Sequence, residues 1–299
     1  GIMLSFVKFF IKKLLTIKLL YDMVVMWLVN RRLTVREVIT MFKEEIYVKI
    51  EKMIKKNQYY TKVDLKRAYE KAMYIYNNIH TYNINGWFFK PMLLKNGNLK
   101  LNNNVLQWDL PSIITCKQAC KFCYALKSEK IYPQTRCMRL RNLFLIEFAL
   151  NDVNFYNELL QKLKRECIWY YSRKGCNVLR LHSSGDIYSS RYLNFIFKWV
   201  ENINDIYSIY TYTKQLDNNI IDDINSTYSN LNIVKSFISI DNKKYINYGS
   251  TEYIKDISQK LDNKGITYHV CDYGSTNAHT CMGNCKACLH CDTVLFNQH

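Results

Sequence analysis

The sequence predicts an α/β protein built as a partial, open parallel β/α barrel of about five to six strands. Three observations predict it. Strand-like and helix-like segments alternate over the second half of the chain, polar residues follow the predicted strands, and no internal repeat or linker interrupts the series. A helix between each pair of strands implies parallel strands joined by right-handed crossovers. So few units do not close an eight-stranded barrel, so we expect the sheet to stay open.

Composition places the chain among globular proteins. It has 299 residues, an apolar share of 48% and only 9 Gly and 3 Pro, which excludes collagen-like and low-complexity classes. The formal net charge of +17 favours a polyanionic partner such as nucleic acid or an anionic membrane face, whereas AT-rich coding enriches Lys without structural cause. The 11 cysteines and the lack of a convincing secretory signal indicate a reducing compartment, so we expect a cytoplasmic protein.

The sequence pattern of residues 1–83 predicts a basic helical N-terminal extension. Lysines and an aspartate interrupt the apolar segment 3–29, and its longest apolar run is far shorter than the ~20 residues of a membrane span. We therefore expect no transmembrane span, and a helix that packs on the domain or lies on a membrane surface. Residues 34–57 and 62–80 show apolar residues at helical spacing, and Thr34 begins a capping-box pattern.

Residues 84–272 predict the β/α domain. Turn signals at residues 85–86 and 96–97 indicate a hairpin, and residues 105–114 predict the first barrel strand, which runs into a cysteine loop. The later predicted helices span 138–165, 191–202, 218–227 and 252–263. The predicted strands among them span 177–182, 207–214, 232–240 and 266–271.

The cysteine loop, residues 116–123, carries the strongest chemical signal. Cys116, Cys120 and Cys123 are spaced C-x3-C-x2-C, and the aromatic Phe122 precedes the last of them. A disulfide network needs an even number of cysteines, and a closed zinc site needs four ligands, usually as two separated pairs. Three thiolates on a [4Fe–4S] cluster leave one iron open to a small molecule. The alternative is a zinc knuckle completed by a distant Cys or His.

Residues 116–124 resemble the signature of the radical S-adenosylmethionine enzymes, in which an aromatic also precedes the third cysteine. The resemblance implies a partial barrel, an open-site [4Fe–4S] cluster and S-adenosylmethionine chelated to the fourth iron through its amine and carboxylate. It also implies reductive cleavage of that cofactor to a 5′-deoxyadenosyl radical, with a flavodoxin- or ferredoxin-like electron donor. Phe122 and Tyr124 are candidate cofactor-binding residues within this signature.

Polar residues follow the predicted strands at the edge where parallel α/β proteins bind ligands. Ser183, Ser184, Gly185 and Asp186 stand where the radical enzymes have a Gly-Gly-Glu motif that contacts the methionine amino group. By that resemblance Gly185 allows close backbone approach and Asp186 accepts from the ammonium, although Asp is shorter than Glu. The alternative is a turn that caps the next helix. We expect His182 to be packed or hydrogen-bonded. The other candidate cofactor contacts at strand ends are Lys214, Ser239 and Asp241.

A second resemblance covers roughly residues 105–245. The segments CKFCYALKSEKIYP, RLHSSGDIYSSRYLNFIFKWV and IYTYTK, in that order, are similar to the gene-product-88-type family of phage and plasmid proteins. That family shares a Cys-Tyr-Ala segment, a Ser-Gly-Asp-x-Tyr-Ser segment and a Tyr-Thr-Lys/Arg strand end. The resemblance implies a fold and a site rather than a substrate.

Residues 273–299 predict a separate metal-binding segment. Its cysteines, spaced C-x3-C-x2-C-x2-C, are Cys281, Cys285, Cys288 and Cys291. So compact a run is typical of ferredoxin-type ligation, in which the last cysteine sometimes serves another cluster, so Cys271 is a candidate additional ligand. We expect an auxiliary iron–sulfur cluster, with structural zinc as the alternative.

Together these patterns predict a radical S-adenosylmethionine-type iron–sulfur enzyme without assigning a catalytic residue. The positive charge favours a nucleic acid or nucleotide substrate, and an auxiliary cluster, by analogy with peptide-modifying relatives, favours a peptide. The alternative from another class is a non-catalytic nucleic-acid-binding protein with zinc at both cysteine groups. A third hypothesis, electron transfer between two clusters, leaves the open-site triplet and the Ser-Gly-Asp segment without a role.

Overall fold

The computed structural model of the chain describes most residues from 35 onward. The described ranges are 35–55, 59–85, 91–98, 101–116, 123–241, 243–271, 287–291 and 293–297. The chain divides into two compact units, residues 1–49 and 50–299. The described part of the first unit is helical and belongs to α2 (Val35–Ile54), whose last residues fall in the second unit. The helix predicted over residues 3–29 and the cap predicted at Thr34 lie outside the described residues. Nowhere in the described ranges is a helix both long and apolar enough to cross a membrane.

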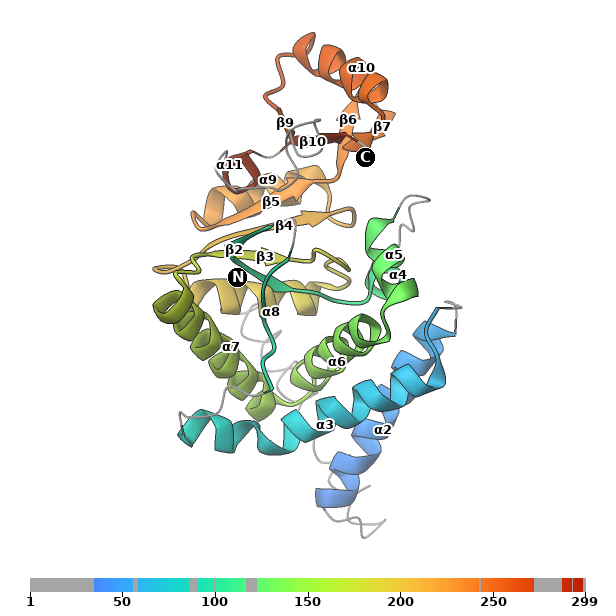
Figure 1. The fold of residues 1–299 in the computed structure, drawn as a ribbon, viewed down its shortest axis with the longest axis vertical. Helices are drawn as coiled ribbons and strands as arrows, with labels where there is room; N and C mark the ends of the chain where they lie inside the picture. The colour runs from blue at the N-terminus through green and yellow to red at the C-terminus, as the bar shows by residue number, and fades with distance from the viewer. Residues whose placement is uncertain are drawn as a thin grey trace, which may run out of the picture. The chain divides into compact units, whose positions relative to one another are not determined.

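The second unit is a mixed α/β fold around a five-stranded sheet, with the order β1-β2-β3-β4-β5 (Figure 1). β1 (Lys95–Asn98) pairs antiparallel with β2 (Leu101–Trp108). β3 (Val178–Leu181), β4 (Ser208–Thr213) and β5 (Leu231–Lys235) then add in parallel, so the parallel strands lie in chain order. Each crossover therefore moves one strand along in the same direction, as in β/α barrels and unlike doubly wound sheets, where the order reverses.

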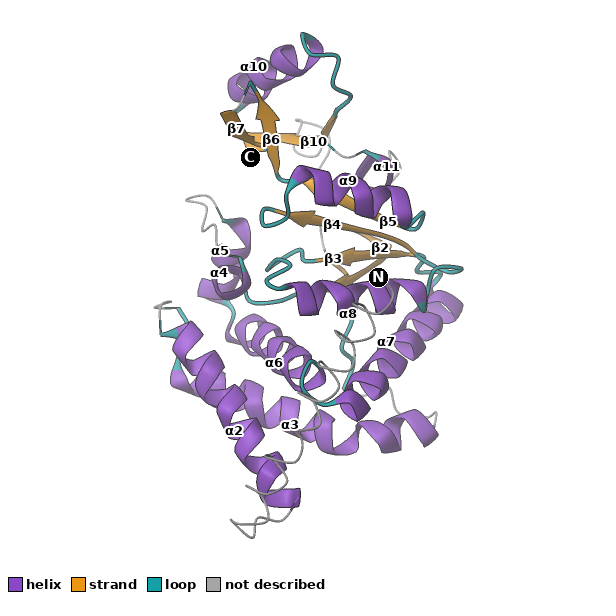
Figure 2. Ribbon diagram, turned by 180° about the vertical axis from the view of Figure 1, so that it is seen from behind, coloured by secondary structure: helices purple, strands orange, loops and turns teal. Residues whose placement is uncertain are grey.

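Helices connect these parallel strands. The helices described between β2 and β3 are α4 (Ser112–Thr115), α5 (Tyr124–Ile131), α6 (Pro133–Ala149) and α7 (Val153–Lys174). α8 (Ser190–Glu201) connects β3 to β4, and α9 (Asn218–Thr227) connects β4 to β5. Figure 2 shows α8 and α9 in front of the strands, on one face of the sheet. α3 (Lys62–Asn85) packs against α6 and α7.

The helix predicted over 138–165 is instead two helices, α6 and α7. The break follows Ala149, and the Asp152 side chain caps α7 by accepting hydrogen bonds from the backbone N–H groups of Asn154 and Phe155. Such a cap satisfies donors that lack a partner at a helix start. The apolar pattern continues across the break, so periodicity alone does not reveal it. Ser189 likewise caps α8. This cap is one part of the alternative interpretation of residues 183–186, in which they form a turn that leads into a capped helix.

The face of the sheet toward α8 and α9 is apolar. Leu106, Leu179, Ile209 and Leu231 stand side by side on neighbouring strands, and all four are buried. One pair further along β2, the Trp108 ring meets an α8 tryptophan edge-on, with ring centroids 5.7 Å apart. Burial of such side chains is the main favourable contribution to folding, at about 25 cal/mol per Å² of apolar surface. This face therefore forms the core between the sheet and its helices.

The region after β5 departs from the predicted strand order. The strand predicted over 232–240 breaks after Lys235, and β6 (Phe237–Ile240) pairs antiparallel with β7 (Lys243–Ile246). The fifth predicted strand appears as β9 (His269–Cys271), which pairs in parallel with β10 (Val294–Asn297) in a separate sheet of order β8-β10-β9. The predicted fifth unit therefore does not extend the main sheet.

A second, smaller core forms in this region. α10 (Thr251–Asp262) packs on β8 (Tyr248–Gly249) and β10. The buried side chains of this core are Ile238, Ile240, Ile254, Ile257, Leu261 and Leu295. The sequence pattern predicted strands here, but strand partners depend on contacts far apart in the chain. The α/β class is confirmed, and the open barrel stays a hypothesis.

Candidate functional site

The cysteine loop begins and ends at described residues. Cys116 is the C-cap of α4, and Cys123 is the N-cap of α5. Both are partly exposed, and neither forms a disulfide bond. Cys120, Phe122 and the side chain of Tyr124 lie outside the described residues. The geometry of the site is therefore that of the two ends of the loop and of the strand ends around them.

Gly185 fixes the approach of the β3–α8 loop to the segment that leads into Cys116. Its φ is +84°, and a Cβ added there would lie 2.7 Å from Leu110 Cβ and 2.7 Å from Thr115 Oγ1. The Leu110 N–H also donates to the Ser184 carbonyl at 3.0 Å. Only glycine fits this backbone and this space. The structure thus shows Gly185 packed closely against the chain's own residues, and its predicted close approach to a cofactor stays a prediction.

Thr115, the residue before Cys116, is held from two loops. Its hydroxyl donates to the Pro111 carbonyl at 2.7 Å and accepts from the Asp186 N–H at 3.1 Å. Its carbonyl accepts from Gln215 Nε2, in the β4–α9 loop, at 2.6 Å. Thr115 is fully buried. The ends of β3 and β4 therefore both hold the entrance of the cysteine loop.

Asp186 ties the end of β3 to the end of β4. Its carboxylate accepts from Thr213 Oγ1 at 2.6 Å, from the Lys214 N–H at 3.0 Å and from the Ile187 N–H at 2.7 Å. Burial raises the pKa of Asp186, and these hydrogen bonds and the charge of Lys214 oppose that rise. A carboxylate has about four acceptor positions, so one further donor can be accommodated. The predicted contact of Asp186 with an ammonium group stays a prediction.

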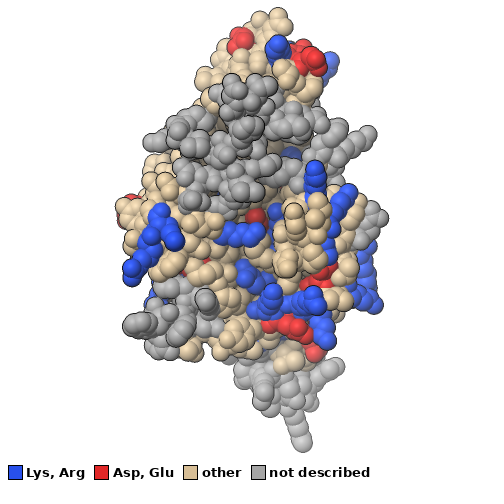
Figure 3. Space-filling model, viewed as in Figure 1, with Lys and Arg blue, Asp and Glu red and all other residues tan. Residues whose placement is uncertain are grey.

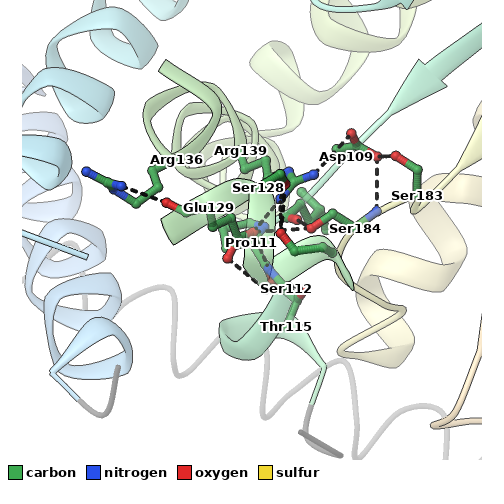
Figure 4. Close-up of polar contacts among 12 residues, drawn as sticks. Asp109, Pro111, Ser112, Thr115, Ser128, Glu129, Arg136, Arg139, Ser183 and Ser184 are labelled. Carbon is green, nitrogen blue, oxygen red and sulfur yellow. Dashed lines mark hydrogen bonds and ion pairs between the residues drawn. The ribbon is translucent and has the colours of Figure 1, made fainter. Parts of the chain in front are cut away.

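The exit of the cysteine loop is anchored by a buried cluster around Glu129 of α5 (Figure 4). We call Asp109, Ser112, Glu129, Arg139 and Ser184 the Glu129 cluster. The Glu129 carboxylate accepts from the N–H and hydroxyl of Ser112 at 2.9 and 2.7 Å, and from Ser184 Oγ at 3.2 Å. It also pairs with Arg139 Nη1 at 2.8 Å. Glu129 therefore joins α5, which follows Cys123, to α4, which precedes Cys116.

Asp109 completes the cluster at the end of β2. It accepts from the Ser184 N–H at 3.1 Å and from the Ser183 hydroxyl, and it lies 3.9 Å from Arg139. Arg136, one turn earlier on α6, donates to the Glu129 carbonyl at 2.6 Å. Both ends of the cysteine loop are thus fixed to the same group of strand ends and helices.

Sequence reasoning missed several of these residues. Glu129 and Arg139 sit on helices, where charged residues usually face water, and Thr115 and Gln215 carry no motif. The roles of Thr115, Glu129 and Arg139 follow from burial, because a buried charged or polar group needs a partner. The sequence signal that points to this cluster is an acidic residue, Asp109, close to the end of an apolar strand.

His182 is packed and hydrogen-bonded. Its Nδ1 lies 2.9 Å from Thr211 Oγ1, and its Nε2 lies 2.8 Å from the Tyr192 hydroxyl. Burial lowers the pKa of His182 to about 4, so the ring is neutral at neutral pH. Its backbone φ of 56° is left-handed, a conformation that non-glycine residues adopt at some cost. These contacts assign His182 to the support of the strand ends.

Asp241 lies elsewhere. It occupies the turn between β6 and β7 with a φ of 49°, is exposed, and pairs with Lys264 at 2.7 Å. The break after β5 sends this segment into the hairpin, so the structure does not bring Asp241 together with the loop anchors. The side chain of Ser239 lies outside the described part of the chain.

The second cysteine group is described at Cys288, Cys291 and Cys271, whereas Cys281 and Cys285 lie outside the described residues. Tyr212 of β4 donates to Cys288 Sγ at 2.7 Å. Asn232 of β5 donates to the carbonyls of Cys288 and Cys291 at 3.0 and 3.1 Å. α11 (Ala287–His290) therefore docks on β4 and β5. Cys271 ends β9, where it pairs with Phe296 of β10.

The metal predictions stay predictions. Among the described side chains, no three His, Cys, Asp or Glu are grouped closely enough to hold a metal ion. Each of the two predicted cysteine groups has members outside the described residues.

The family model described as gene product 88 matches residues 92–295. It spans the main sheet, the ends of the cysteine loop and most of the C-terminal cysteine segment. A search of curated proteins and a search of solved structures each found no match.

Proposed function

The chain belongs to the gene product 88 family, because the family model matches more than half of it, and we propose that it is a radical S-adenosylmethionine-type iron–sulfur enzyme. One observation carries the proposal. Cys116 follows the first of four parallel strands in sequential order, and hydrogen bonds tie the residue before it to the ends of the next two strands. We further propose that this sheet is part of an open barrel whose interior is the face opposite α8 and α9.

The residues at the loop ends fit an iron–sulfur cluster. Thiolates are the ligands that such clusters prefer, and Cys116 and Cys123 are partly exposed thiols at two anchored positions. In the proposal Cys116, Cys120 and Cys123 hold a [4Fe–4S] cluster. When bound, the cluster supplies one electron for cleavage of the sulfonium of S-adenosylmethionine, giving methionine and a 5′-deoxyadenosyl radical that removes hydrogen from the substrate.

The chain's own residues position and shield this chemistry. The Gly185 contact and the Glu129 cluster hold the two ends of the cysteine loop at fixed places on the sheet edge. Asp186 has acceptor capacity for the methionine ammonium; burial raises the pKa of Asp186, and a cation bound beside it would favour its ionised form. In an enzyme of this kind the protein supplies binding, orientation and exclusion of water.

The C-terminal cysteines would hold a second cluster or zinc. Tyr212 and Asn232 hold Cys288 and Cys291 against the sheet face opposite α8 and α9. Cys281 and Cys285 would complete this group in the proposal, with a flavodoxin- or ferredoxin-like protein as electron donor and the cytoplasm as the compartment. The +17 net charge keeps a nucleic acid or nucleotide among the substrate hypotheses, beside a peptide.

Anaerobic purification tests the proposal. We expect brown protein with iron and acid-labile sulfide which, with a strong reductant and S-adenosylmethionine, forms 5′-deoxyadenosine and methionine. Cys116→Ala should abolish both products, whereas Cys176→Ala, at a buried thiol outside both cysteine groups, should retain them. An intact cluster that yields neither product would refute the proposal.

Metal analysis of the same preparation tests the alternative. Colourless protein with zinc at both cysteine groups would support the nucleic-acid-binding hypothesis. In that case we expect retention on DNA or RNA to fall steeply with salt, because phosphate contacts release counterions.

A further inference from the structure

One row of side chains crosses the main sheet on the face opposite α8 and α9. Strand register aligns five residues, one on each strand, and we call them the polar row: Lys95, Gln107, Arg180, Tyr210 and Asn232. The next row along the strands is the apolar one at Leu106. Because side chains alternate between the two faces of a sheet, the polar row points away from the helices.

Core packing does not explain the polar row. Gln107 is 4% exposed and Asn232 is 8% exposed. Asn232 has partners in the carbonyls of Cys288 and Cys291. Gln107 Nε2 is buried and has no hydrogen-bond partner among the described residues. A buried donor left without a partner destabilises the fold, and a ligand acceptor at this place would relieve that cost.

The row carries positive charge on both sides of Gln107. Lys95 on β1 and Arg180 on β3 are its direct neighbours, and strands lie about 4.8 Å apart, so both cations are within reach of one small group. The Arg180 guanidinium lies 5.7 and 5.9 Å from the ring centroids of Tyr212 and Tyr210, which orient it along the face.

The polar row itself contains no acidic side chain. Asp109, which directly follows β2 on the same face, is engaged by Arg139, Ser183 and Ser184, and its charge also acts on Lys95. On the side of the molecule seen in Figure 3, basic side chains are more abundant than acidic ones. Lys95 is exposed and Gln107 is buried, so the row runs from solvent at β1 into the sheet.

We propose that the polar row is a substrate subsite that binds an anionic oxygen group, a carboxylate or a phosphate, through Lys95, Gln107 and Arg180. The C-terminal cysteine segment, which Tyr212 and Asn232 hold, lies at the other end of the row. The inference rests on the proposed function in assigning the bound group to the substrate. Binding of the anion itself needs no cleavage of S-adenosylmethionine.

Calorimetric titration of the full chain, purified without oxygen, tests the subsite. Inorganic phosphate and glutarate are the two probes, at constant ionic strength, and saturation by one and not the other identifies the source of the anion. Gln107→Leu should weaken that binding about tenfold, because it removes a hydrogen bond to a charged group. Arg180→Gln should weaken it at least as much. Lys198→Gln, an exposed cation on α8 paired with Glu201, removes equal charge and should leave affinity within about twofold.

A stability measurement separates binding from structure. If Gln107 is a packing residue, Gln107→Leu lowers the melting temperature. If it serves a ligand, the variant without ligand keeps or gains stability, because an unpaired buried amide is removed.

Three results would overturn the inference: no saturable binding of either probe, unchanged binding by Gln107→Leu, or equal weakening by Lys198→Gln. Cleavage of S-adenosylmethionine without anion binding would refute this inference and leave the proposed function standing. Anion binding without cleavage of S-adenosylmethionine would refute the proposed function and leave the anion site standing.

Discussion

Replacing Gly185 by alanine tests whether the close approach of two loops holds the entrance of the cysteine loop. Alanine at a φ of +84° costs about 1–2 kcal/mol in backbone strain. Its Cβ would lie 2.7 Å from both Leu110 Cβ and Thr115 Oγ1, and 3.0 Å from the Leu110 carbonyl carbon. These neighbours are backbone or buried groups that move only with the strand end, and overpacking of this kind costs about 1–3 kcal/mol. We therefore expect a loss of about 2–5 kcal/mol in unfolding free energy.

Gly265→Ala is the matched control. Its φ of +66° is also left-handed, but a Cβ there meets nothing within 4 Å, so only the backbone cost of about 1–2 kcal/mol remains. Equilibrium unfolding in urea measures both variants, compared at equal slope. The difference of about 1–3 kcal/mol between them reports the close approach alone.

The same pair of variants links packing to the site. A forced shift of residues 110–115 displaces Cys116, so Gly185→Ala should also lose bound iron per chain, whereas Gly265→Ala should not. Equal loss of stability in the two alanine variants would show that the packing between the β3–α8 loop and Thr115 has no special role.

Further predictions concern the support of the loop and of the strand ends. Glu129→Ala should cost about 3–5 kcal/mol in unfolding free energy, because it removes the nearest carboxylate of the buried Arg139 and the acceptor of both Ser112 donors. Glu201→Ala, at an exposed ion pair, should cost under about 1 kcal/mol, and similar losses in the two variants would contradict the anchoring role. His182 titrates near pH 4 in the folded chain and near 6.5 when unfolded, so the unfolded state binds more protons between these values. The contribution of neutral His182 to the free energy of unfolding is fully present above pH 6.5, and about 3 kcal/mol of that contribution is lost as the pH falls to 4. His182→Asn, which tolerates the left-handed backbone, should flatten that slope in unfolding experiments, and an unchanged slope would reject the assignment. Asp152→Ala should destabilise the chain by about 1–2 kcal/mol through loss of the α7 cap. Asp217→Ala should have little effect, because the side chain of this N-cap residue makes no cap hydrogen bond. Thermal unfolding followed by circular dichroism measures both variants, and equal effects would contradict the prediction.

Local pattern predicted the regular elements well. The helix predicted over 218–227 has these bounds in the structure, and the strand at 207–214 and the helix at 252–263 differ by one residue at each end. The break after Lys235 was missed because the apolar run continues through it. The N–H of Ser236 donates to Thr213, and its carbonyl accepts from Asn247, so partners distant in the chain decide where that strand ends.

The candidate site was predictable in outline only. The rule that ligands bind at the carboxyl ends of parallel strands selected Asp186 and Lys214, which meet. It did not select Glu129, because a single acid on a helix carries no sign of burial. Gln107 was missed for a related reason: its strand was predicted, but the row it forms depends on the register of four other strands.

The anchors of the cysteine loop also decide how the fold should depend on metal. Hydrogen bonds and an ion pair to other parts of the chain hold the two ends of the loop, through Thr115 on one side and Glu129 on the other. Loop closure is therefore already set by the fold, and metal binding adds to a formed scaffold instead of creating it. A metal-stabilised binder behaves in the opposite way, because its binding energy is folding energy and chelators unfold it. Treatment with a chelator should thus remove colour and cofactor cleavage while leaving the far-ultraviolet circular dichroism of the main sheet and helices unchanged. Cooperative unfolding on chelation would instead favour the zinc-stabilised alternative.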